Sequence, residues 1–141
     1  MQVTINDVRY AVHDALAAAF PTVTVSSVAP NPPLESPYFL VRLLEFTQTQ
    51  ELGNRYRRSL PFVVQYVAAQ QSIDDKYAIA EVMMAALKYV TVGGYQLPGQ
   101  SLSIEMIDGE LHLFVTYAML VREQQLDSPK MQKLEEGTTV G

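Results

Sequence analysis

The feature that most constrains this chain is a polar segment, residues 47–59, that lies between two mostly apolar runs. Residues 38–46 precede it and residues 60–67 follow it, and both runs have the composition of strands. Gly53-Asn54 is a pair that can form a two-residue hairpin turn, which would set Leu52 opposite Arg55 and Gln50 opposite Arg57. The sequence therefore predicts one long hairpin with an apolar root and a polar end.

We call residues 47–59 the arm. At ~3.3 Å per residue, roughly six polar residues on each limb give the arm a length of roughly 20 Å. A ribbon of two strands is only marginally stable in water. We therefore expect the arm to lean on another structure, and we predict that this structure is a neighbouring subunit.

The same turn fixes the register of the root. It pairs Val41 with Tyr66 and Leu43 with Val64, so that both faces of the root are apolar. Strands that are apolar on both faces are covered on both sides, by helices or by a second sheet. Pro61 has no N–H group for the ladder and predicts an edge or a bulge at the base of the arm.

Two amphipathic helices are expected. The first, residues 4–20, starts at Thr4 with Asp7 in its first turn. The second is capped by Ser72 and begins with two aspartates. The first helix has an apolar stripe of Ile5, Val8, Val12, Ala15, Leu16 and Ala19. The core stripe predicted for the second helix is Ile73, Tyr77, Ala80, Met84 and Leu87, widened by Ile79, Met83, Ala86 and Val90.

The remaining segments complete an α+β pattern. Asp108-Gly109 is a strong turn signal and predicts a second hairpin, with Glu105 opposite His112 on its surface. The other expected segments are a strand at 22–28, a proline-rich loop at 29–37, a small ribbon at 89–92 and 95–98, and a short helix after Ser128-Pro129.

We predict an antiparallel or mixed sheet built from two hairpins and packed by two helices, with a long protruding hairpin arm and a short C-terminal tail helix. The domain spans residues 1–125. Residues 126–141 form a tail that docks on its own domain or on a partner through Met131 and Leu134.

Composition and motifs exclude several classes of function. A net charge of −5 argues against a general nucleic-acid binder, and the absence of cysteine removes thiolate chemistry and makes structural zinc improbable. No run approaches the ~20 apolar residues of a membrane span, and the N-terminus lacks the features of a secretory signal, so we expect a cytoplasmic protein or one that assembles in the cytoplasm. Glu45 is the one candidate for a buried carboxylate, facing Phe62 and paired with an arginine of a neighbouring strand or subunit. We expect no catalytic, cofactor or metal site.

The run Glu51-Leu52-Gly53-Asn54-Arg55-Tyr56-Arg57-Arg58, followed by a Pro-Phe strand, resembles a family of small phage proteins, the tail terminators of prophages and phage-like particles of Gram-positive bacteria. Weaker resemblances occur in the same order along the chain. They are Thr-Ile-Asn-Asp at residues 4–7, Pro-Tyr-Phe at 37–39, Ile-Asp-Gly-Glu-Leu-His at 107–112 and Pro-x-Met-x-x-Leu-Glu at 129–135. The resemblance therefore covers nearly the whole chain.

The resemblance implies a structural role without enzymatic activity or a cofactor. Tail terminators are α/β proteins that form a ring, usually a hexamer, on the head-proximal end of a finished tail tube. The ring stops tube polymerisation and docks neck proteins, and also the sheath where the tail contracts. DNA passes through the lumen without being read, and no membrane is involved.

We expect the arm to provide subunit and partner contacts. The candidate residues for these contacts are Glu51, Gly53, Asn54, Arg55, Tyr56, Arg57 and Arg58, together with Met131 and Leu134 in the tail. Arginine pairs bidentately with carboxylates, which suits contacts with a neighbouring subunit or the tube. The arginines can also serve only to keep the arm soluble. The alternatives to a terminator are another ring protein of the neck or tail, such as a head–tail connector or the tube protein, and a monomeric adaptor.

Overall fold

The computed structural model describes residues 3–27 and 37–122. The predicted α+β class and mixed sheet are confirmed. Strands follow the order β1-β2-β4-β7-β6-β5, with β3 pairing the outer part of β4, and the β1–β2 pair is parallel. The elements are α1 (Ile5–Ala19), β1 (Thr24–Ser26), β2 (Tyr38–Leu43), β3 (Thr47–Gln50), β4 (Arg55–Val67), α2 (Ile73–Leu87), β5 (Tyr89–Val92), β6 (Tyr95–Ile107) and β7 (Glu110–Arg122).

Helix α1 forms as the sequence predicts. Thr4 is the N-cap: its hydroxyl accepts from the Asp7 amide, and the Asp7 carboxylate accepts from the Thr4 amide. This capping box satisfies two amide groups that the helix itself leaves without partners. The buried face consists of Val8, Ala11, Val12 and Leu16.

Helix α2 begins at the predicted cap, since the Ser72 hydroxyl accepts from the Asp75 amide. The predicted core stripe is only partly right. The buried face consists of Lys76, Ala80, Met83 and Leu87, whereas Ile73, Tyr77 and Met84 are exposed. The helix is apolar on more than one face, so its periodicity alone does not show which face meets the sheet.

The second hairpin is confirmed. Asp108 and Gly109 both have positive φ, 52° and 78°, as a type I′ turn requires, and Glu105 lies opposite His112. Strand β6 runs continuously from the small ribbon into this hairpin, with a register shift between Gln100 and Ser103. The surface position expected for His112 is wrong. The ring is buried at 9% exposure, and its Nδ1 lies 3.1 Å from the Glu110 carbonyl oxygen.

At the root of the long hairpin, β2 and β4 pair in a different register from the predicted one. Leu43 lies opposite Phe62, where the predicted turn would pair it with Val64. The first limb is split into β2 and β3, because residues 44–46 leave the ladder beside Pro61. Leu44 still donates to the Pro61 carbonyl at 2.8 Å, but Thr47 pairs with Ser59, so one extra residue is accommodated on the first limb. This bend is the bulge that Pro61 predicts.

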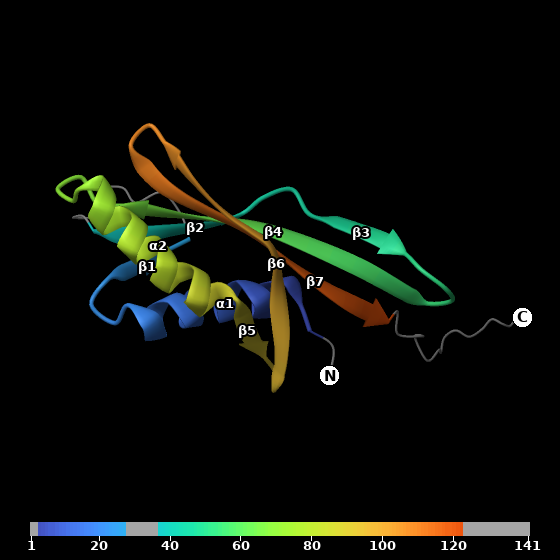
Figure 1. The fold of residues 1–141 in the computed structure, drawn as a ribbon. Helices are drawn as coiled ribbons and strands as arrows, with labels where there is room; N and C mark the ends of the chain where they lie inside the picture. Colours follow the sequence, from blue (N-terminus) through green and yellow to red (C-terminus); the bar gives the residue numbers. More distant parts are fainter. Residues whose placement is uncertain (1–2, 28–36, 123–141) are drawn as a thin grey trace, which may run out of the picture.

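Both helices lie on the same face of the sheet (Figure 1). Aromatic rings fill that face: Phe20 and Phe39 are 4.9 Å apart between centroids, and Phe62 and Tyr117 are 5.9 Å apart. Among the described residues, the helices α1 and α2 both cover this face of the root. Val63 on the other face is also buried, at 2% exposure, so the expectation that both faces are covered stays a prediction. Residues 29–36 of the proline-rich loop, the predicted boundary at residue 125 and the tail helix lie outside the described residues.

Candidate assembly surface

Around the arm, the sheet consists of three strands. Strand β4 pairs with β3 on one side and with β7 on the other, and the β7 pairing continues from Tyr66 opposite Leu111 out to Arg55 opposite Arg122. Figure 1 shows β3, the first half of β4 and the end of β7 extending away from the helices together. The arm is therefore not an isolated ribbon, as the sequence predicted, because β7 of its own chain supports it. That it also contacts a neighbouring subunit stays a prediction.

The turn of the arm contains Gly53 and Asn54, as predicted. Gly53 has φ of 68°, and the Arg55 amide donates to the Leu52 carbonyl at 3.4 Å. The Glu51 amide also donates to the Arg55 carbonyl, at 2.8 Å, so two residues of the first limb share one partner on the second. This bulge moves the register by one residue and sets Gln50 opposite Tyr56, where the sequence predicted Arg57.

The three arginines of the arm lie on two faces, because side chains alternate along a strand. Arg58 lies on the same face as Leu60 and Phe62, which is the face that the helices cover nearer the root, and its Nε donates to Gln48 Oε1 at 2.7 Å. Arg55 and Arg57 lie on the opposite face. Arg57 Nε is 3.0 Å from Glu51 Oε2, which is the ion pair of the arm.

The face of Arg55 and Arg57 also includes two residues of β7. Arg122 lies opposite Arg55, and Leu120, which is 55% exposed, lies opposite Arg57. We call these four residues, Arg55, Arg57, Leu120 and Arg122, the basic face. The sequence gives the strand that ends at Arg122, but its pairing with the arm depends on strand order, which periodicity does not encode.

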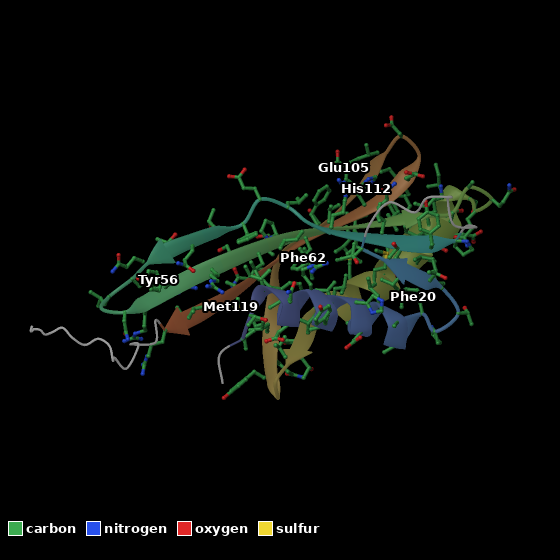
Figure 2. All side chains as sticks on the ribbon, turned by 180° about the vertical axis from the view of Figure 1, so that it is seen from behind. Phe20, Tyr56, Phe62, Glu105, His112 and Met119 are labelled. Carbon is green, nitrogen blue, oxygen red and sulfur yellow. The ribbon has the colours of Figure 1, made fainter. Side chains whose placement is uncertain are left out.

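The arm is basic on an acidic protein. The arm and the end of β7 beside it, residues 47–59 and 118–122, contain four arginines and one glutamate, whereas the whole chain has a net charge of −5. Leu52 at the tip is 85% exposed, and every residue of β3 is exposed. Figure 2 shows Tyr56 on this extension, far from Phe62 above α1. An exposed basic edge with an apolar side chain at its tip is suited to bind an acidic partner surface.

The other candidates from the sequence are not brought to this surface. Glu45 is exposed in the bend between β2 and β3, so the buried carboxylate predicted there is wrong. His13 is exposed, and its Nδ1 is 3.5 Å from Asp14 Oδ1. Met131 and Leu134 lie outside the described residues.

The described residues contain no group of three histidine, cysteine or carboxylate side chains that could hold a metal ion. None of the helices described is long and apolar enough to cross a membrane. An open hollow of about 360 Å³ lies between α1 and the β5–β6 turn, lined by residues that include Asp7, Tyr10, Asp14 and Tyr95.

Comparison with known proteins identifies the family. Residues 7–129 match the family described as phage tail terminator protein. No curated protein matches the chain. One solved structure matches 88% of this chain and 99% of its own with 14% identity and a TM-score of 0.43, and this likeness carries no conclusion about function. Since the family match covers most of the sequence, the chain belongs to the phage tail terminator family, whose members are structural components of the virion tail.

Proposed function

We propose that this protein assembles into a closed ring, most simply a hexamer, at the head-proximal end of the tail tube. The ring stops tube polymerisation and offers a docking surface to neck proteins, and to the sheath if the tail contracts. DNA crosses its lumen without sequence recognition. The protein acts by assembly, without a cofactor or catalysis.

The observation that carries the proposal, beside the family match, is the basic arm. Arg55, Arg57 and Arg58 project from a sheet that continues beyond the helices, and β3 pairs only with β4 within the described part of the chain. A long exposed strand at a sheet edge is a template for association unless it is protected. In a ring each subunit offers one surface to a different surface of the next, and a protruding arm is suited to make such a contact.

The test is assembly and capping in solution. We expect sedimentation to show one discrete particle of several subunits, and electron microscopy of polymerising tube protein to show tubes that stop growing when this protein is added. A tube protein would instead form long stacks by itself, and an adaptor would remain monomeric. Either of these outcomes would overturn the ring.

The arm is tested by reversing its charge. We expect Arg55→Glu, Arg57→Glu and Arg58→Glu, combined in one chain, to abolish the particle and the capping. The control combines Arg9→Glu, Arg42→Glu and Lys88→Glu, which change the net charge equally at positions outside the arm. A triple arm variant that forms the same ring and still caps tubes would show that the arginines serve only solubility.

A further inference from the structure

Helix α2 has more apolar surface than the core covers. Ile73, Tyr77 and Met84 share one side of the helix, next to the buried face, and are 61%, 48% and 37% exposed. We call these three residues the α2 stripe. Exposed apolar side chains gathered on one side of a helix indicate an interaction surface better than a lone exposed side chain does.

The α2 stripe has an acidic border. Asp74 and Glu81 are exposed and lie on one side of the stripe, at helical spacings of three and four residues from Tyr77. Lys76 does not neutralise them, because it is buried and its Nζ donates to the Gly109 carbonyl at 2.6 Å. The partner of this surface should therefore combine apolar side chains with positive charge.

The basic face of the arm has that composition. Arg55 lies directly opposite Arg122, and like charges in this position on a sheet are destabilising. Among the described residues, neither of these two arginines has an ion-pair partner, since the ion pair of the arm joins Arg57 to Glu51. Leu120 lies on the same face and Leu52 at the tip, and both are exposed. Carboxylates from another surface would relieve the repulsion.

The two surfaces lie at opposite ends of the molecule. Figure 1 shows the arm at one end of the sheet and the N-terminal end of α2 at the other, so they do not meet within one chain. A contact between them joins two copies head to tail, and head-to-tail contacts close into rings when the rotation between copies allows it.

We infer that the basic face of one copy docks on the α2 stripe of the next. Arg55 and Arg57 face Asp74 and Glu81, while Leu52 and Leu120 cover the stripe. The inference rests on the proposed self-assembly and names the two surfaces that make it. The occupant of the stripe is a second copy of this chain. A tube subunit at the stripe, or DNA at the basic face, is a competing outcome of the test.

The experiment uses two charge-reversed proteins. The arm variant has Arg55→Glu and Arg57→Glu, and the stripe variant has Asp74→Arg and Glu81→Arg. Each alone sets like charges together at the contact, so we expect sedimentation to show association at least about tenfold weaker than in the wild type. Mixed in equal amounts, the two should recover particles of wild-type mass, because the altered arm now complements the altered stripe.

The matched control is Asp75→Arg. It makes the same change of charge as Asp74→Arg in the same helical turn, half that of the stripe variant, but on another side of α2 from the stripe. We expect it to assemble as the wild type does. Thermal melts within a few degrees of the wild type would show that all variants are folded.

Four results would overturn the inference. If the wild type assembles and either variant assembles equally well, or if mixing restores nothing, these two surfaces do not pair, although the ring itself stands. If the arm variant loses only affinity for duplex DNA, the basic face binds nucleic acid. A wild-type protein that remains monomeric and leaves tubes uncapped would overturn the proposed function together with this contact.

Discussion

The phenol of Tyr117 connects α2 to the sheet, and we predict that removing its hydroxyl has a large effect. The Tyr117 side chain is fully buried, and its hydroxyl donates to the Leu87 carbonyl at 2.6 Å. Leu87 is the last residue of α2, so its carbonyl has no partner within the helix. The Tyr117→Phe variant would leave this carbonyl buried without a donor.

The expected loss follows from that burial. A buried acceptor that loses its partner costs about 1–3 kcal/mol of unfolding free energy. The packing leaves little room for water to replace the hydroxyl, because a Cβ atom at Gly99 would come within 2.9 Å of the Leu87 carbonyl oxygen. In a chain of this size, we expect the melting temperature to fall by roughly 3 °C for each kcal/mol.

Tyr66 supplies the matched control. Its ring is equally buried on the neighbouring strand β4, but its hydroxyl donates to the half-buried Gln71 side chain at 3.1 Å. Gln71 can turn to water when the hydroxyl is removed, so we expect Tyr66→Phe to cost only about 0.5–1 kcal/mol. The assay is urea unfolding of both variants, followed by circular dichroism. Equal losses, or a larger loss for Tyr66→Phe, would refute the reasoning.

Three further predictions concern stability and are measured in the same way. Burial raises the pKa of Tyr117, so above pH 10 the phenol of the unfolded chain ionises while that of the folded chain keeps its proton, and the free energy of unfolding falls by about 1.4 kcal/mol per pH unit. Between pH 9 and 11 the difference in unfolding free energy between the wild type and Tyr117→Phe should therefore shrink, and a constant difference would contradict this. Gly99→Ala should cost about 1–3 kcal/mol, because its Cβ would lie 2.9 Å from both the Leu87 carbonyl oxygen and Val115 Cγ2; an unchanged urea midpoint would rule out this close approach. Thr4→Ala should cost about 1 kcal/mol by removing the cap of α1, and Thr4→Ser should restore most of it; equal stability of the two variants would show that the cap contributes nothing.

Local signals predicted the elements of this fold well. The caps at Thr4 and Ser72 and the type I′ turn at Asp108 and Gly109 each depend on a few neighbouring residues, and all are found in the structure. Such features are predictable because the interactions that stabilise them join residues only a few positions apart in the sequence.

Register and strand order were harder to predict. The long hairpin was expected to keep one register from Gly53 to its root, but an extra residue at Leu52 and another beside Pro61 move the pairing by two positions. Bulges are stabilised by contacts from other strands, which a single hairpin sequence does not contain. The pairing of β7 with the arm was missed for the same reason, and with it the position of Arg122 opposite Arg55.

The error on α2 has a different cause. Periodicity indicates that a position is suited to burial, but it does not say which chain buries it. Ile73, Tyr77 and Met84 fit the same helical pattern as Ala80 and Leu87, yet the isolated subunit covers only the latter two. In a component of the virion tail, apolar positions that the pattern predicts as core and the single chain leaves open are the first places to look for a contact with another protein. Here the acidic border of the stripe makes this reasoning testable, because it specifies the charge that the partner must carry.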